Sequence, residues 1–231
     1  MNTLNRYLIL LLGGLGLTAG FCNAQTLNWG SPMFSDLVDS KGDVLDDTFV
    51  FELGAFVNSF TPDATNTAAW LDNWQTFDAA DYNGVETPVD DGIYGYFTAA
   101  SAMNSSGTGP ASAPGAISFE GLDAYIWVRN SNTPGVGTEW SLSRAGGWQF
   151  PSVDPDCCGG DLPLEWSLSD LTPSYVPVWG TQNGVKGGGE ITDTGTYTLQ
   201  TATFVPIVVP EPSSSILALL GVIIALIHRR R

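Results

Sequence analysis

The stretch that decides the fold is residues 124–143, which read AYIWVRNSNTPGVGTEWSLS. Residues 124–128 alternate, so that small and aliphatic side chains fall on one face and aromatic side chains on the other. An alternation with a period of two indicates a β-strand. The segment 132–135, Asn-Thr-Pro-Gly, is typical of a turn, and a second alternating run follows at 138–143. We therefore predict a β-hairpin here.

Further short alternating runs extend this pattern along the chain. The clearest is 48–57, where Phe49, Phe51 and Leu53 share one face. Tight turns are predicted at 91–93 and at Asn183-Gly184. Many short strands separated by turns predict an all-β fold, a single jelly-roll-like β-sandwich. The other predicted strands are 93–99, 116–119, 147–150, 164–168 and 196–204.

One segment has helical periodicity instead. Thr61-Pro62 is suited to begin a helix, because proline is favoured in the first turn. Trp70, Trp74 and Phe77 follow at i, i+4 and i+7, which places them on one helical face. We expect one short helix that covers an edge or an end of the sheet.

The segment 25–205 is strongly acidic. It has 23 of the 24 acidic residues and four of the eight basic ones, so its formal net charge is 4 − 23 = −19. Nucleic-acid binding requires clustered cations, so we expect no nucleic-acid partner. The charge favours solubility and repels anionic lipid.

Histidine is absent from this segment, since His228 is the only histidine of the chain. This excludes Ser-His-Asp and Cys-His mechanisms there, and also any metal site with histidine ligands. Carboxylate pairs such as Asp46-Asp47 and Asp90-Asp91 are abundant, but a chain this acidic contains such pairs by chance. We expect no enzymatic activity and no cofactor, with a histidine-free hydrolase acting through two carboxylates as an alternative.

The loop 154–161 contains two more candidate features. Cys157 and Cys158 are adjacent and are the only cysteines after Cys22. They can form a strained vicinal disulfide, pair between chains or stay free, and we expect little effect on global stability. Asp154, Asp156 and Asp161 are calcium candidates, because calcium prefers oxygen ligands. Their spacing does not match an EF-hand loop, so we expect no metal site.

Aromatic residues indicate a candidate ligand surface. Tyr125 and Trp127 share a strand face, and Trp140 falls across the predicted hairpin from them. Aromatic faces stack on sugar rings, so these three residues are the candidate glycan platform. The alternative is that they belong to the core, which large aromatic residues usually dominate.

The N-terminus has the three parts of a secretory signal peptide. Residues 1–6 are short and basic, residues 7–17 are almost wholly apolar, and Cys22-Asn23-Ala24 resembles a small-residue cleavage site. We predict a signal peptide at 1–24 and a mature chain that begins at Gln25. The mature domain is then 25–205.

The C-terminus has a tether and a membrane segment. Residues 206–212 are punctuated by prolines, which favour an extended chain. Residues 213–227 as a helix would be about 22 Å long, short of a ~30 Å hydrocarbon core unless the bilayer thins locally. Arg229, Arg230 and Arg231 follow and predict a cytoplasmic C-terminus. We assign 213–231 to a transmembrane sorting helix with its arginine cluster.

The order Pro210-Glu211-Pro212, apolar helix and terminal arginines resembles the PEP-CTERM sorting signal. The resemblance covers only about the last twenty-five residues. It implies recognition of the tail by an exosortase-type membrane protease, transient residence in the inner membrane, and then a place on the cell surface or in the exopolysaccharide matrix. The expected function is that of an exported structural or adhesive protein, with a carbohydrate-binding module for exopolysaccharide as the alternative.

Overall fold

The computed structural model describes residues 25–84, 95–153, 163–172 and 174–204, and within them the fold is all-β. An eight-stranded sheet has the order β12-β7-β6-β3-β4-β5-β1-β8, and a four-stranded sheet has the order β10-β9-β11-β2. The large sheet comprises β1 (Gln25–Gly30), β3 (Val50–Phe56), β4 (Trp74–Gly84), β5 (Gly95–Met103), β6 (Tyr125–Arg129), β7 (Glu139–Ser143), β8 (Leu164–Ser167) and β12 (Ala202–Thr203). The small sheet comprises β2 (Leu37–Val38), β9 (Thr181–Gln182), β10 (Val185–Lys186) and β11 (Leu199–Gln200).

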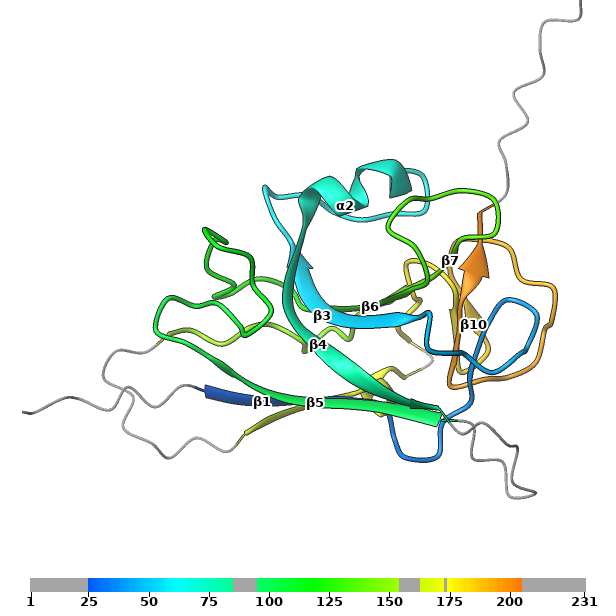
Figure 1. The fold of residues 1–231 in the computed structure, drawn as a ribbon, viewed down its shortest axis with the longest axis horizontal. Coiled ribbons are helices and arrows are strands. Elements are labelled where there is room, and N and C mark those ends of the chain that lie inside the picture. Colours follow the sequence, from blue (N-terminus) through cyan, green and yellow to red (C-terminus); the bar gives the residue numbers. More distant parts are fainter. Residues whose placement is uncertain (1–24, 85–94, 154–162, 173, 205–231) are drawn as a thin grey trace, which may run out of the picture.

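The large sheet folds over on itself along β4. The first part of this strand pairs with β3, from Trp74 opposite Phe56 to Ala80 opposite Phe51. Its last part, from Asp81 onward, pairs with β5 instead. In Figure 1, β4 slopes from the layer of β3 and β6 down to the layer of β5 and β1. The two halves of the sheet therefore face each other in a sandwich-like arrangement.

The space between these halves holds the first core. Alternation points Phe51 and Leu53 of β3 inward, and Trp29 of β1 and Phe97 of β5 meet them from the opposite layer. The ring centroids of Phe51 and Phe97 are 4.6 Å apart. Because each of these strands has its apolar residues at every second position, the pleat alone directs them to one side.

The second core lies on the other face of β3, β6 and β7. It is dominated by aromatic side chains and includes Phe56, Trp70, Trp127, Trp140 and Trp179. The short helices η1 (Thr67–Ala69) and α2 (Trp70–Asn73) bring Trp70 to this face, and its ring stacks on that of Trp140 at 5.5 Å. Figure 1 shows α2 above these strands. The central strands are therefore buried on both faces.

Two sequence predictions are confirmed in detail. The 124–143 hairpin is present, since β6 and β7 pair antiparallel with Arg129 opposite Trp140. Asn183-Gly184 forms the predicted tight turn between β9 and β10, with φ of 46° and 77°. Positive φ at both central residues is what a two-residue hairpin turn requires, and asparagine and glycine tolerate it.

The predicted helix is correct only in part, because helical structure begins at Thr67 rather than at Thr61-Pro62 and ends at Asn73. The chain leaves the helix there and enters β4, so Trp74 and Phe77 are strand residues. An irregularity in the pairing after Leu53 sends Trp74 to the second core and Phe77 to the first. Their helical spacing is thus the result of a β-bulge, which changes the face on which residues fall.

Other predicted strands are only partly correct. Residues 116–119 and 147–150 form no strand, although Phe119, Trp148 and Phe150 are core residues as expected. Turn and loop hydrogen bonds hold them, for example from the Phe150 amide to the Leu122 carbonyl. The predicted strand 196–204 is divided at Thr201, so that β11 joins the small sheet and β12 the large one. The predicted turn at 91–93 lies outside the described residues.

Candidate functional site

The three predicted glycan-stacking residues are buried in the second core. Tyr125 is 6% exposed, and Trp127 and Trp140 are fully buried. The rings of Trp127 and Trp140 contact each other edge to face at 4.8 Å. A ring that is packed on its neighbours offers no face to a sugar. The prediction of a glycan platform on these residues is therefore wrong, and their role is in core packing.

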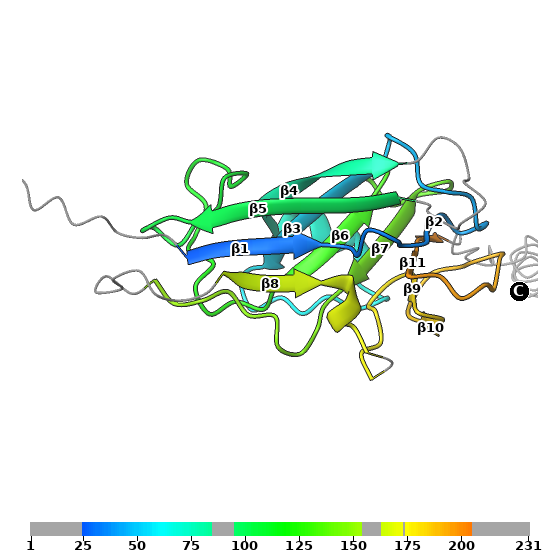
Figure 2. The ribbon, with the colours of Figure 1, turned by 90° about the horizontal axis from the view of Figure 1, so that it is seen from below.

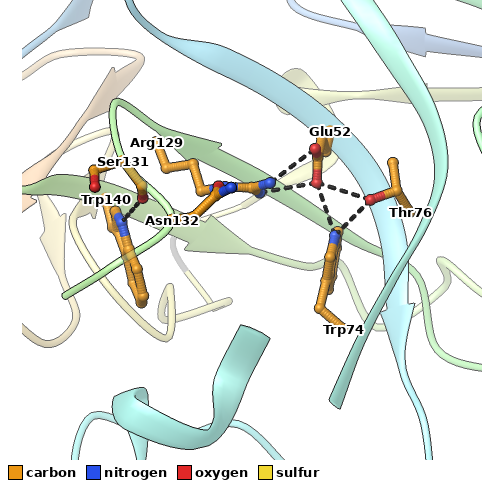
Figure 3. A network of polar contacts seen from close by, with 7 residues as sticks. All are labelled: Glu52, Trp74, Thr76, Arg129, Ser131, Asn132 and Trp140. Atoms are coloured by element: carbon orange, nitrogen blue, oxygen red, sulfur yellow. Dashed lines mark hydrogen bonds and ion pairs between the residues drawn. The ribbon is translucent and has the colours of Figure 1, made fainter. Parts of the chain in front are cut away.

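A buried polar network lies at the edge of this aromatic core (Figure 3). Both Glu52 carboxylate oxygens accept from the Arg129 guanidinium, each at 2.8 Å. The Trp74 indole nitrogen and the Thr76 hydroxyl also donate to Glu52, at 2.8 and 3.0 Å. The Arg129 Nε donates to Asn132, and its guanidinium carbon lies 4.3 Å from the Trp127 ring centre. Bidentate geometry of this kind gives strong charge-assisted bonds.

This network has the character of a structural element. The side chains of Arg129 and Glu52 are 6% and 12% exposed, so the pair is largely removed from water. A buried ion pair is tolerated when its geometry is good and its remaining polar atoms are hydrogen-bonded, as they are here. Both carboxylate oxygens of Glu52 are hydrogen-bonded within the fold, and the pair ties β3 to β6.

A second buried carboxylate joins the two sheets. Glu139 of β7 accepts from the Ser40 amide and hydroxyl at 3.2 and 2.6 Å, and from the Thr201 hydroxyl at 2.7 Å. Ser40 follows β2 of the small sheet, and Thr201 connects β11 to β12. Hydrogen bonds from three donors offset the cost of burying this acceptor.

A polar depression lies on the outer face of β4, β5, β1 and β8, hereafter the outer groove. A depression of about 460 Å³ is lined by Asn28, Asp78, Ala79, Asp81, Thr98, Ala99 and Ala100. It adjoins a second one of about 170 Å³ that shares Asn28 and Thr98 and extends to Glu165 and Ser167. Asn28 donates to Glu165 at 2.7 Å. In Figure 2 these four strands lie in front, with no element drawn over them.

Another shallow depression of about 380 Å³ lies at the start of β4. The loop 111–117 forms one wall, and Trp74, Gln75 and Thr76 form the other. The Gln75 side chain accepts from the Ile117 amide at 3.1 Å, which holds the loop against the strand. No charged side chain lines this depression.

The largest pKa shift among the described groups occurs at Tyr82, which lies on the opposite face of β4 from the outer groove. Burial, assisted by the nearby Asp46 carboxylate, raises the pKa of Tyr82 to about 12. Its hydroxyl donates to the Leu45 carbonyl at 2.8 Å, and its ring stacks on Phe51. Perturbed pKa values often mark functional sites, but here the packing of one phenol against the first core explains the shift.

Several predicted site residues lie outside the described residues. These are the cysteine pair Cys157 and Cys158, the calcium candidates Asp154, Asp156 and Asp161, the sorting motif Pro210, Glu211 and Pro212, and the anchor Arg229, Arg230 and Arg231. Within the part of the chain that the structure describes, no group of three or more acidic, cysteine or histidine side chains is placed to hold a metal. The helices in that same part are all too short or too polar to cross a bilayer.

The outer groove was not predicted from the sequence. Asp81 was missed because the run from Trp74 to Phe77 resembles a helix, so β4 was not expected. The sequence feature that could have indicated the groove is an alternation of small and polar residues with a period of two. These residues are Thr26 and Asn28 on β1, and Thr98 and Ala100 on β5. Such a pattern normally marks only the solvent face of a sheet, and register is needed to bring these residues together.

Comparisons with known proteins give no relationship. No protein-family model matches the chain, and neither a curated protein nor a solved structure is significantly similar to it.

Proposed function

We propose that this chain is an exported structural or adhesive protein that an exosortase-type protease sorts to the cell surface or the surrounding matrix. The observation that carries the proposal is the order of segments after residue 205. A proline-punctuated tether with Pro210-Glu211-Pro212 is followed by an apolar run and three terminal arginines. The basic N-terminus and the apolar run after it support export.

The described domain is consistent with this role. Its buried carboxylates Glu52 and Glu139 are occupied by structural hydrogen bonds. The exposed carboxylates of the outer groove are Asp81 on β4 and Glu165 on β8. These strands are separated by β5 and β1, so they lie three interstrand spacings apart. That separation is about 14 Å or more, whereas glycosidase carboxylates lie about 5 to 10 Å apart. This pair gives the alternative of a histidine-free hydrolase no support.

We assign the sandwich-like fold to the jelly-roll kind as part of the same proposal.

Mass spectrometry of the protein recovered from the cell surface tests the sorting proposal. We expect the mature chain to begin near Gln25 and to end before Ile216. A Pro210→Ala/Pro212→Ala variant should accumulate in the inner membrane with its tail intact, while the Asp72→Asn variant, altered on α2, should be processed normally. Recovery of an intact Arg231 terminus from the surface pool would overturn the processing step and leave a plain membrane anchor.

A further inference from the structure

The outer groove is a part of the described surface where several polar side chains converge, and the Asp81 carboxylate among them makes no hydrogen bond within the described fold. Alternation turns Trp29 and Phe97 toward the first core, and their neighbours Asn28 and Thr98 therefore face outward. The register places Asn28 between Ala100 on β5 and Glu165 on β8. It also places Asp81 beside Thr98. Four strands thus contribute to one continuous surface.

The floor of this groove is low because its central residues are small. Ala79 and Ala100 line the larger depression, and Gly30 lines the smaller one. Asp81, Asn28 and Glu165 rise from this floor as the hydrogen-bonding groups. A volume of about 460 Å³ is within the range of small-ligand sites, roughly 300 to 1,000 Å³. An extended molecule can therefore lie across the strands.

The polar groups are left available to a ligand. Among the described residues, the Asp81 carboxylate has no hydrogen-bond or ion-pair partner. The Asn28 amide fixes one oxygen of Glu165 at 2.7 Å, and the other oxygen can accept a further donor. Both carboxylates accept and cannot donate when ionised, so the complementary ligand is rich in hydrogen-bond donors.

The chemistry of the groove excludes several ligand classes. No lysine or arginine lines it, so an anionic ligand would meet only repulsion from Asp81 and Glu165. These carboxylates are too far apart to share one metal ion, since three interstrand spacings measure about 14 Å. A peptide that binds by strand addition needs an unpaired sheet edge. The strands β4, β5 and β1 are paired on both sides, and the free edge of β8 lies at the border of the groove, so strand addition there would not cover Asp81.

We propose that the outer groove binds a neutral, hydroxyl-rich glycan chain. Sugar hydroxyls donate to Asp81 and Glu165, and Asn28 and Thr98 lie between these two contacts. Alternation also places Tyr96 on this face, two residues along β5 from Thr98, where an aromatic ring can contact a sugar ring. The site differs from the buried Trp127 and Trp140 cluster. This proposal adds a binding partner to the proposed surface role. It rests on that role only for the location, the cell surface or matrix, at which the protein encounters the glycan.

Affinity electrophoresis of the full-length chain in neutral detergent tests this proposal. The gels contain either a neutral glycan (dextran, laminarin or galactomannan) or the anionic glycan alginate. Polylysine is added in solution as a cationic competitor. We expect retardation by at least one neutral glycan, none by alginate, and little change up to 0.5 M NaCl. Each charge-assisted hydrogen bond is worth about 1.5 to 3 kcal/mol, so Asp81→Asn and Glu165→Gln should each weaken binding about 10- to 150-fold.

Two further variants separate binding from folding. Ala100→Met fills the floor of the groove and should abolish retardation, whereas Asp72→Asn on α2 should leave it unchanged. All variants should keep the melting temperature of the wild type, because the altered residues are exposed.

Absence of retardation by every neutral glycan would overturn the proposal, as would retardation that the groove variants do not change. Salt-sensitive polylysine binding that the groove variants lose would instead identify a cationic partner. Normal surface delivery of the variants would show that a failure here does not touch the sorting proposal.

Discussion

At the scale of single residues, the carboxylate of Glu52 connects two kinds of stabilisation. It neutralises Arg129, and it also accepts from the indole of Trp74, a member of the aromatic core. Arg129 in turn covers the ring of Trp127. The ion pair and the aromatic packing therefore depend on each other, because either one fixes the side chains that the other requires.

Removal of one partner of this pair should be costly. We expect Glu52→Gln to lower the free energy of unfolding by about 3 to 5 kcal/mol, because the Arg129 charge stays buried without its counter-ion. Urea denaturation of the full-length chain measures it. The exposed pair of Arg144 and Asp123 is the matched control, and Asp123→Asn should cost at most about 1 kcal/mol. Equal losses in the two variants would contradict a special role for burial at Glu52.

Tyr82 predicts how stability changes at alkaline pH. The pKa of Tyr82 is about 12 in the folded chain and about 10 when unfolded, so the folded state holds the phenol proton more strongly. This contribution to stability is fully present below pH 10 and is lost as the pH rises from 10 to 12. Tyr82→Phe should be less stable by about 1 kcal/mol at pH 7, because it loses the bond to Leu45, and should fall less steeply above pH 10. Parallel melting-temperature curves for the two proteins from pH 9 to 12 would refute this explanation.

At the scale of elements, the sequence predicts strands with strict alternation well and predicts poorly those that depend on distant pairing. The hairpin of β6 and β7 was predictable because its pattern, turn and pairing are all local. The start of β4 was not, because a bulge opposite Leu53 and Gly54 breaks the alternation and produces a helical spacing by accident. The outer groove could not be predicted from the sequence for a related reason. It combines β1 with β8, which lies more than 130 residues further along the chain.

Gly54 is the residue on which this bulge depends. A Cβ atom there would lie 2.2 Å from the Gln75 carbonyl oxygen and 2.5 Å from the Trp74 ring, closer than any real contact. The carbonyl cannot move away without disturbing the pairing of β3 and β4, and displacement of the ring would break the hydrogen bond from Trp74 to Glu52. We expect Gly54→Ala to cost more than about 3 kcal/mol or to abolish folding, whereas Gly147→Ala, which has open space, should be nearly neutral. Thermal melts of both variants would decide the matter, and a stable, wild-type-like Gly54→Ala protein would show that the strands can separate here.

At the scale of the whole molecule, the segment 25–205 has 23 acidic and four basic residues, and two of the four basic side chains are engaged in ion pairs. Arg129 is buried with Glu52, and Arg144 pairs with Asp123. The remaining acids of the described surface have few opposite charges near them, so the folded state carries net self-repulsion. This repulsion favours a dispersed, soluble domain, and it also limits the partners to molecules that are neutral or cationic.

Salt should therefore stabilise this protein. The Debye length falls from about 30 Å at 0.01 M to about 8 Å at 0.15 M, which screens repulsion between distant carboxylates but has little effect on the buried Glu52 pair. A gain of about 1 kcal/mol corresponds to a melting temperature roughly 2 to 4 °C higher for a chain of this size. Scanning fluorimetry of the full-length chain in NaCl measures it, and the variant Asp47→Asn/Asp72→Asn/Glu120→Gln, which removes three exposed charges, should respond less. If salt instead lowered the melting temperature, attractive ion pairs such as the exposed pair of Arg144 and Asp123 would outweigh the repulsion, and the explanation by net self-repulsion would be wrong.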